Sequence, residues 1–287
     1  MTGIALLLAG IAIGTWNGNW FPSGRAEHRA AAEVEESRSR AAAAMLAEGL
    51  RKVDPEGTND VILCLNEMRG SRAVSNLVAA IGRPGLRLVS ISGYRRRDRF
   101  DTQQDAIATT LPAAECGWSR WRNARELTPP RGYAFAALVI DPATTARVYA
   151  VHLKSDYGAT TEAERQQNRA KRANSIVQLI EIERPTSRRK TPPVVIAGDF
   201  NVDRWGADSG TYAVFGPLEK AGFGNPLRTL DEKERWTHFG KGKWPNSALD
   251  YVMTRGVTPV GDPATAACRE VSDHRALFVL VERRVGK

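Results

Sequence analysis

Acidic, amide and histidine side chains stand beside apolar runs at several points along the chain. In "VVIAGDFN", residues 194–201, the apolar run ends at Gly198, and Asp199 and Asn201 follow. Side chains two positions apart on an extended chain point to the same side. The segment therefore presents a carboxylate and a carboxamide together at the end of a buried strand.

Five further segments place polar residues at the beginning or end of an apolar run. They are "TWNGNW" with Asn17, "LCLNEMRG" with Glu67, "YAVHLKS" with His152, "SALDYVM" with Asp250, and "SDHRALFVLV" with Asp273 and His274. A single Asp or Asn in such a position is usually a turn or cap residue. Six segments with complementary chemistry instead favour a cleft at one sheet edge.

These residue types suit the hydrolysis of a phosphate ester. That reaction needs neutralisation of the phosphate charge, a positioned water and help for the departing alkoxide. Asp199 would orient or deprotonate the water while Asn201 holds a phosphate oxygen, and Asp250 would keep the His274 imidazole available as a cation. Oxygen ligands suit Mg²⁺, with Mn²⁺ or Ca²⁺ as alternatives, rather than zinc. The candidate metal ligands are Glu67, Asn17 and Asp273.

The same motifs carry a family resemblance. "TWNGNW", "LNEMRG", "VHLKSDYG", "GDFN", "LDY" and "SDH" occur in the order and approximate spacing of the endonuclease/exonuclease/phosphatase superfamily. The match runs from about Ile13 to Val281, and "GDFN" with a downstream "SDH" is its most specific part. The resemblance implies an α/β fold, a four-layer α/β/β/α sandwich in which two packed mixed β-sheets are flanked by helices.

The resemblance also implies roles for the matching positions. It makes Glu67 the main metal ligand with Asn17 nearby, and it places Asp273 at the metal or at the attacking water. The implied catalytic residues are His152, Asp199, Asn201, Asp250, Asp273 and His274. Ser155 falls where an Asn often binds phosphate, with Lys154 beside it. Asn66 and Asn19 depart from the Gln and Asp of other members, so no metal contact is assigned to Asn19.

Basic residues mixed with aromatic residues give the main indication of the substrate. They occur in "GYRRRDRF", which is expected to form a loop, in "CGWSRWRNARELTPPRG" and in "HFGKGKWPN". Together with a net charge of +9, this mixture suits phosphate backbones and stacked bases. We therefore expect a nuclease whose substrate is nucleic acid, with DNA favoured over RNA. The expected substrate-binding residues are Ser155, Lys154, Arg95, Arg96, Arg97 and Arg131.

Other functions are compatible with the same core. A sphingomyelinase-like lipid phosphodiesterase would use exposed aromatic loops, for which Trp20–Phe21 and the pair Trp118 and Trp121 are candidates. An inositol polyphosphate phosphatase would also use basic loops. A catalytically silent nucleic-acid-binding relative is the alternative without enzymatic activity, although Glu67, Asp199 and His274 are all present. The basic segments can equally be solvated loops whose tryptophans cover the core.

Apolar strand-like runs alternate with helical stretches, which predicts one α/β domain of packed layers. Strands are expected at 11–17, 60–67, 86–92, 104–111, 132–140, 146–154, 194–201, 248–254 and 276–282. Helices are expected at about 26–52, 71–81, 160–184 and 211–221. The second helix should bury Val74, Leu77, Val78 and Ile81. The third should begin with a Thr161–Glu164 capping box and bury Ala173, Ile176, Val177 and Ile180.

The 287 residues are interpreted as a single domain, 13–287, preceded by an apolar segment, 1–12. That segment is either a trimmed secretory signal or an extra strand, so a secreted or periplasmic location is slightly favoured over a cytoplasmic one. No stretch approaches the ~18 apolar residues of a membrane span. We expect a monomer without an obligate protein partner. Cys64 should be a core residue, and pairing of Cys116 with Cys268 is left open.

Overall fold

The computed structural model describes residues 10–24, 30–96, 99–100, 103–124, 127–184, 192–206, 210–242 and 244–282. The first sheet has the order β12-β13-β1-β2-β6-β3, with β1 (Gly10–Phe21), β2 (Asp60–Met68), β3 (Arg87–Ile91), β6 (Gln104–Thr109), β12 (Pro259–Ala267) and β13 (Arg275–Glu282). The second has the order β11-β10-β9-β8-β7, with β7 (Ala113–Arg120), β8 (Gly132–Asp141), β9 (Thr144–His152), β10 (Val194–Asp199) and β11 (Asp250–Arg255).

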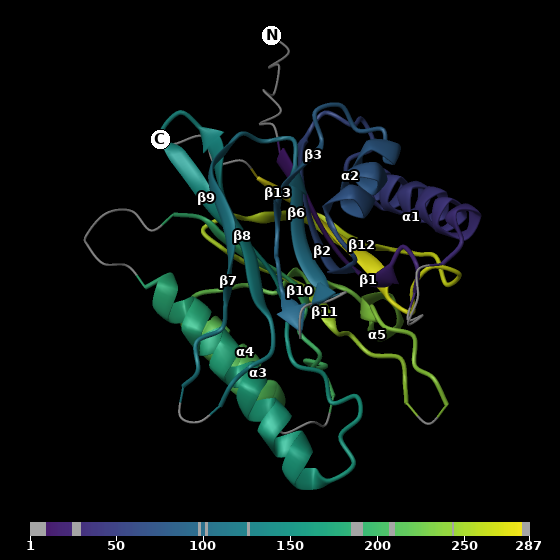
Figure 1. The fold of residues 1–287 in the computed structure, drawn as a ribbon. Coiled ribbons are helices and arrows are strands. Elements are labelled where there is room, and N and C mark those ends of the chain that lie inside the picture. Colours follow the sequence, from purple (N-terminus) through teal and green to yellow (C-terminus); the bar gives the residue numbers. More distant parts are fainter. Residues whose placement is uncertain are drawn as a thin grey trace.

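Helices cover the outer faces of the two sheets (Figure 1). α1 (Ala32–Val53) and α2 (Ser71–Ala80) pack on the first sheet, and α3 (Glu162–Ile182) and α4 (Gly210–Lys220) pack on the second. A 3₁₀ helix (Pro226–Thr229) and α5 (Glu232–Arg235) precede β11. The inner faces of the two sheets pack on one another, which confirms the predicted four-layer sandwich of mixed sheets.

The buried positions explain why these segments form strands. β8 alternates strictly between buried and half-buried residues, as expected for a strand with one face in the core. β1 is buried along almost its whole length because it lies in the middle of its sheet, between the inner core and α1. Ile11 and Ile13 face the second sheet, whereas Ala12 and Trp16 face the helices. This alternation fixes the register of β1.

The helices agree with the sequence patterns except on one face of α3. The predicted stripe of α2 is buried, and α3 begins with the predicted Thr161–Glu164 capping box. The predicted stripe of α3 is confirmed at Ile176, which is buried, and is wrong at Val177, which is 41% exposed, while Ala173 and Ile180 are half-buried. The buried face contains Arg172, Ser175, Ile176 and Leu179. Polar residues lie on it because Arg172 donates to the carbonyl of Lys154 (2.9 Å) and thereby satisfies backbone beneath the helix.

Three stretches of strand were not expected. β7 and β12 lie at sheet edges and are largely exposed, so they lack the apolar alternation that marks a half-buried strand. β12 also contains Gly261 and Pro263, which edge strands tolerate. The segment expected to be a loop near residue 95 contains a two-stranded hairpin of β4 (Arg95–Arg96) and β5 (Arg99–Phe100).

Two further predictions concern the chain start and the cysteines. β1 begins at Gly10, so residues 10–12 belong to the strand, and residues 1–9 lie outside the described residues. The predicted first helix begins at Ala32, and residues 25–29 are likewise not described. Cys64 is buried as predicted, and Cys116 and Cys268 are free thiols. No helix among the described residues is long and apolar enough to cross a membrane.

Candidate active site

The predicted site residues come together because of strand direction. β1 and β2 are parallel, as are β9 and β10, so the carboxyl ends of all four strands lie at one end of the sandwich. β11 and β13 run antiparallel to their neighbours, which brings their amino ends to the same place. The residues concerned are Asn17, Glu67, His152, Asp199, Asp250 and His274. Each is at most 7% exposed.

Register places three of these residues side by side in the second sheet. Asp199 at the end of β10 is opposite His152 of β9 and Asp250 of β11. In the first sheet, Asn17 of β1 is opposite Asn66 of β2, one position before Glu67. A register irregularity between Leu65 and Met68 coincides with positive φ at Glu67 and aims its carboxylate out of the ladder.

Asn17 joins the two sheets. Its Nδ2 donates to Asp199 Oδ2 (2.9 Å) and to Glu67 Oε1 (3.3 Å). His152 Nε2 lies 3.6 Å from Asp199 Oδ2 and 3.7 Å from Glu67 Oε1. Two buried carboxylates, an amide and an imidazole therefore surround one small volume between the sheets.

His274 and Asp250 form the predicted pair. The His274 Nδ1 and the Asp250 Oδ2 are 2.7 Å apart, and both side chains are buried. The backbone of Asp250 is held in turn by the hydroxyl of Thr237, which accepts its N–H at 2.8 Å. His274 Nε2 is then directed toward Asp199, 3.9 Å from its Oδ2. The imidazole thus has one nitrogen on a buried carboxylate and the other facing the cleft.

Electrostatics divides these groups into distinct protonation states. Burial, followed by the charge of Asp250, raises the pKa of Asp199 to about 7. Burial lowers the pKa of His274, but the charge and hydrogen bond of Asp250 outweigh it and raise that pKa to about 10. Burial lowers the pKa of His152 well below 6.5. At neutral pH the site therefore combines an imidazolium, a neutral imidazole and a carboxylate close to its protonation point.

Backbone strain is concentrated around the same residues. Among the described residues, five non-glycine residues have positive φ: Asn19, Trp20, Glu67, Arg131 and Asn201. All five lie in segments that form the site, as expected where geometry serves function rather than stability. Gly198 explains the glycine of "GDFN", because its φ is 144° and a Cβ there would lie 1.9 Å from the Val151 carbonyl oxygen. Only glycine allows β10 to approach β9 so closely before Asp199.

Comparison with known families decides what this arrangement is. The endonuclease/exonuclease/phosphatase family matches residues 14–274. The chain belongs to this family. Its members are generally hydrolases of phosphoester bonds that use a divalent metal. No curated protein matches the chain significantly in sequence.

Solved structures of the family share the fold at low sequence identity. An endonuclease/exonuclease/phosphatase family protein from Leptotrichia buccalis C-1013-b is 13% identical, with a TM-score of 0.63 over 95% of this chain and 99% of that one. Sphingomyelinase C from Streptomyces griseocarneus is 15% identical, with 0.60 over 94% and 99%. TDP2 from Caenorhabditis elegans is 14% identical, with 0.58 over 96% and 75%. At these identities the likeness establishes the fold alone.

The donor atoms at the site fit the divalent metal that the family uses. Glu67 and Asp199 are buried carboxylates that both lie within hydrogen-bonding distance of the Asn17 amide nitrogen. Carboxylate and amide oxygens are the ligands that Mg²⁺ takes in proteins. Glu67 is the residue best placed to hold the ion. Asn17 presents its nitrogen to Glu67 while its oxygen accepts from the backbone of Asn19, so amide ligation requires the amide to turn over.

The predicted phosphate-binding residues make hydrogen bonds within the protein. Asn201 donates its backbone N–H to Asp199 Oδ1 (2.8 Å) and its amide to the Leu153 carbonyl (3.1 Å), so it holds the end of β10 against β9. Lys154 donates to the Ser155 carbonyl, and Ser155 Oγ accepts from the Tyr157 backbone. Lys154 and Ser155 stay predictions for substrate binding.

The predicted basic residues occupy different places. The Arg131 guanidinium donates to the carbonyls of His152 (3.1 Å) and Leu153 (2.9 Å), and its role in substrate binding stays a prediction. Arg95 is exposed on the hairpin. The side chain of Arg96 and the whole of Arg97 lie outside the described residues. Trp121 is a core residue, whereas Trp118 is 41% exposed.

A buried network that supports Asp199 was not predicted as part of the site. Asn66 Oδ1 accepts the backbone N–H of Asp199 (3.1 Å), and Asn66 Nδ2 donates to Asp105 Oδ1 (2.7 Å). Tyr94 donates its hydroxyl to the other oxygen of Asp105 (3.2 Å). Asp105 stands inside a predicted strand as its only acid, and a fully buried acid in a strand is a signal that needs a partner.

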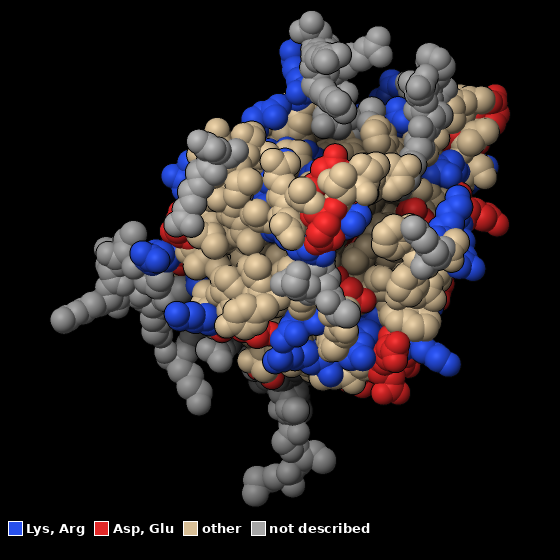
Figure 2. Space-filling model, turned by 90° about the horizontal axis from the view of Figure 1, so that it is seen from below, with Lys and Arg blue, Asp and Glu red and all other residues tan. Residues whose placement is uncertain are grey.

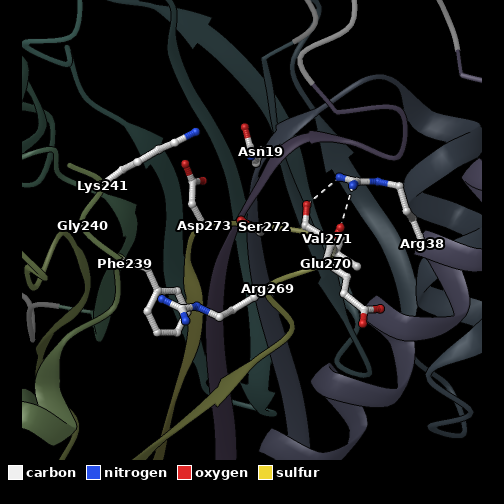
Figure 3. A pocket seen from close by; sticks show the side chains of 10 residues that line it. All are labelled: Asn19, Arg38, Phe239, Gly240, Lys241, Arg269, Glu270, Val271, Ser272 and Asp273. Carbon is white, nitrogen blue, oxygen red and sulfur yellow. Dashed lines mark hydrogen bonds between the residues drawn. The ribbon is translucent and has the colours of Figure 1, made fainter.

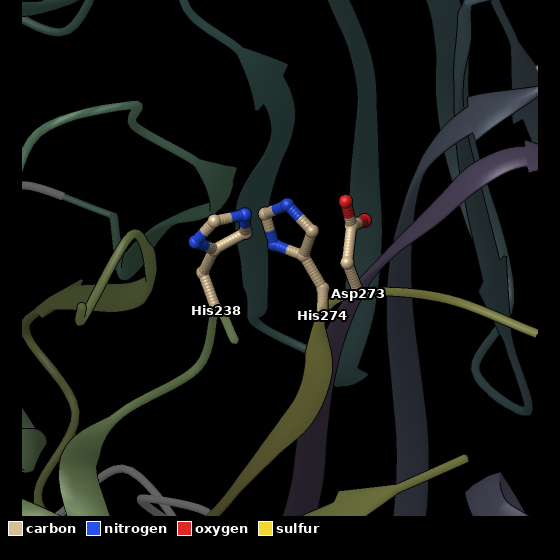
Figure 4. A group of neighbouring side chains, drawn as sticks. All are labelled: His238, Asp273 and His274. Atoms are coloured by element: carbon tan, nitrogen blue, oxygen red, sulfur yellow. The ribbon is translucent and has the colours of Figure 1, made fainter. Parts of the chain in front are cut away.

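His238 is the second residue that the sequence patterns missed. Its ring packs against that of His274 with centroids 4.8 Å apart, and Asp273 lies on the far side of His274 (Figure 4). A bridge between the backbones of His238 and His274 sets this contact. The chain has only four histidines, and three of them, His152, His238 and His274, lie at the site. The small number of histidines could therefore have pointed to His238. Asp273 itself is half-buried beside the cleft.

Proposed function

We propose that this protein is a divalent-metal-dependent phosphodiesterase that cleaves nucleic acid, with DNA favoured. The observation that carries the reaction class is the buried convergence of Glu67, Asp199 and the His274–Asp250 pair. The pKa of Asp199 is close to neutral pH, and the His274 imidazole is held as a cation beside it. A group that can act as general base and a group that can stabilise negative charge therefore lie together in a member of a phosphoester hydrolase family.

The proposed mechanism follows from the protonation states. Asp199 accepts a proton from the attacking water, and Asn17 and the backbone of Asn201 orient its two oxygens. The water oxygen bonds to phosphorus as the P–O bond to the leaving alkoxide breaks, and the alkoxide takes a proton from solvent. The His274 imidazolium faces the developing charge on phosphorus-bound oxygen, and Asp250 stabilises the imidazolium. A divalent cation held at Glu67 supplies neutralisation of phosphate charge when bound. His152, kept neutral by burial, is placed to contact the phosphate from β9.

A basic and aromatic surface supports nucleic acid as the substrate. The exposed Trp118 packs edge-on against the buried Tyr94, with ring centroids 5.6 Å apart, and Arg120 lies over the Tyr94 ring at 5.7 Å. Arg120 also donates to the Arg95 carbonyl, so both arginines are held on one exposed surface. Tyr94 is connected to Asp199 through Asp105 and Asn66, which ties this surface to the site. Such mixed surfaces bind phosphate backbones and bases together.

The charge of the whole molecule agrees with this assignment. The net charge is +9, and Figure 2 shows lysine and arginine side chains in several groups on one face, between neutral surface and a few acidic side chains. A positive surface raises the rate at which a polyanion encounters the protein.

A panel of substrates tests the proposed function. We expect the purified protein with Mg²⁺ or Mn²⁺ to hydrolyse plasmid or single-stranded DNA faster than RNA, sphingomyelin vesicles or an inositol phosphate. Excess EDTA should abolish hydrolysis, and added Mg²⁺ should restore it, because the phosphate charge needs neutralising. Full turnover in EDTA would contradict the metal-dependent mechanism. Hydrolysis of sphingomyelin but of no nucleic acid would show that the substrate is a lipid.

Salt dependence tests the role of the basic and aromatic surface. The binding of a short DNA duplex is measured with the His274→Ala protein. The logarithm of the association constant should fall linearly with the logarithm of the salt concentration, because each neutralised phosphate releases a counterion. Replacing Arg95 and Arg120 together by alanine should flatten that slope by about 0.9 for each arginine lost from a phosphate contact. Arg40→Ala with Arg51→Ala on α1 is the matched control and should leave the slope unchanged. Binding without any salt dependence would contradict a polynucleotide substrate.

A lipid phosphodiesterase is the second candidate, because several aromatic side chains are exposed. Tyr157 is 82% exposed and Trp244 is 65% exposed, in loops that follow strand β9 and precede strand β11. Exposed aromatic residues favour membrane interfaces. The same panel distinguishes the two candidates, since a lipid enzyme should respond to the Trp244→Ala change and to the vesicle surface rather than to salt.

A further inference from the structure

A cavity of about 360 Å³ opens beside the proposed catalytic residues (Figure 3). Its walls come from the end of β1, from Arg38 of α1, from the segment that follows α5, and from the turn that connects β12 to β13. The residues used below are Asn19, Phe239, Lys241, Arg269 and Asp273. The cavity is therefore built by both ends of the chain together with the loop that carries His238.

The cavity is linked to the catalytic residues by neighbouring positions in the chain and by hydrogen bonds. Asp273, which lines it, immediately precedes His274. Asn19, on the opposite wall, donates its backbone N–H to the side chain of Asn17 (2.9 Å), and Asn17 contacts Asp199. Ser272 Oγ donates to the Asn17 carbonyl (2.7 Å), which joins the two walls. A substrate whose reacting phosphate lies at Asp199 and His274 can therefore extend into this cavity.

Two cations in the cavity are available to a ligand. Lys241 is exposed, and within the described part of the chain its ammonium makes no hydrogen bond or ion pair. The Arg269 guanidinium lies over the Phe239 ring, 4.1 Å from the centroid, and has no hydrogen-bond acceptor among the described residues. By contrast, Arg38 donates to the carbonyls of Glu270 and Val271 and so serves to hold the wall (Figure 3).

The contact between the Arg269 guanidinium and the Phe239 ring favours the binding of an anionic ligand by Arg269. Phe239 also has Arg275 near it, 5.3 Å from the centroid. The ring thus holds the Arg269 guanidinium in one orientation, which reduces the entropy that a hydrogen bond to a phosphate would otherwise cost. In Figure 3 the Lys241 side chain extends toward the Asn19 and Asp273 side of the cavity, while Arg269 lies at the Phe239 side. Lys241 and Arg269 therefore line one concave volume from different sides, together with the acidic residues Glu270 and Asp273.

We propose that this cavity is a subsite for a second phosphate of the substrate, adjacent to the phosphate that is cleaved. The inference rests on the proposed function and narrows it to esters that carry at least two phosphate groups, of which a polynucleotide strand is the expected one. Lys241 supplies a point charge, and Arg269 supplies the planar donors that match phosphate oxygens. Both residues act in binding, and neither takes part in the proton transfers.

The test compares dinucleotides that differ by one phosphate. The wild-type protein with Mg²⁺ is assayed on a DNA dinucleotide with hydroxyl groups at both ends, and on the same dinucleotide with a 5′- or a 3′-terminal phosphate. We expect one of the two added phosphates to raise kcat/KM by about tenfold or more, since each charge-assisted contact contributes on that scale. Equal kcat/KM for all three substrates overturns the subsite while leaving the proposed function intact. No cleavage of any nucleotide ester overturns both.

Variants then assign the effect to the cavity. The ratio of kcat/KM with and without the terminal phosphate should fall about tenfold in Lys241→Ala and in Arg269→Ala, and further in Lys241→Glu. Lys220→Ala on α4 and Arg51→Ala on α1 are the matched controls, because both residues are exposed and distant in the chain from the cavity walls. An unchanged ratio in both cavity variants overturns the proposal. So does a fall in inositol polyphosphate hydrolysis without a change in the dinucleotide ratio, which would assign the subsite to that ligand.

Discussion

Replacing His274 by alanine, or Asp199 by asparagine, is expected to lower kcat by about 10²–10⁴-fold while the fold is retained. Asp199 is the acid that accepts the proton of water in the proposed mechanism, and its pKa of about 7 suits that task near neutral pH. His274 provides the buried positive charge that faces the phosphate. Steady-state kinetics on the preferred DNA substrate, with saturating Mg²⁺, measures the loss.

Stability measurements separate this catalytic role from a structural one. Burial and Asp250 raise the pKa of Asp199, so its folded-state charge is unfavourable above pH 7. Asp199→Asn removes that charge and should leave Tm at pH 8 unchanged or higher. Asp231→Asn, at an exposed position that makes no cap hydrogen bond, is the matched control and should alter neither kcat nor Tm. A large fall in Tm with proportional loss of activity would point to a structural role instead.

Asp250→Asn is expected to move the alkaline limb of the pH–activity profile downward by several pH units. The imidazolium form of His274 is the active one, so activity is present below its pKa and is lost as pH rises through it. Without the Asp250 charge, only the weaker influences of Asp199 and Asp273 oppose burial, which lowers the pKa of His274, so that pKa should fall. A return to the ordinary histidine pKa of about 6.5 would lower the fraction of protein that carries the imidazolium at pH 8 roughly 30-fold.

Histidine NMR provides a readout that a packing defect would not move. The pKa of His274 measured from its ring signals should be near 10 in the wild type and markedly lower in Asp250→Asn. If the variant loses activity at pH 8 while the pKa of His274 stays near 10, Asp250 acts on the position of the ring rather than on its charge.

The site shows how far residue type and spacing lead. Glu67, His152, Asp199, Asp250 and His274 were all recognisable because each is a polar residue beside an apolar run, and the structure brings them together. Their protonation states were not recognisable, because these depend on burial and on which charges become neighbours. Asp250 faces His274 across 24 residues of sequence, and only the antiparallel register of β10 and β11 places it beside Asp199.

The basic segments show the limit of the same reasoning. Arg131 belongs to a basic run, and only the structure shows that its guanidinium donates to backbone carbonyls at the end of β9. Trp118 and Trp121 are three residues apart, and one is exposed while the other is in the core. The residue type is the same at the surface and in the core, and the surrounding structure decides whether the side chain contacts solvent or protein.

Residue types and their spacing were enough to predict the family, the layered α/β architecture and the set of candidate catalytic residues. Apolar periodicity and the motifs "GDFN" and "SDH" are local properties, so they survive without knowledge of contacts. The tertiary structure alone decided the edge strands β7 and β12, the buried support of Asp199 by Asn66 and Asp105, the packing of His238 on His274, and the cavity at Lys241 and Arg269. These features are made by segments distant in sequence, and their free energy comes from contacts that form only when the two sheets pack.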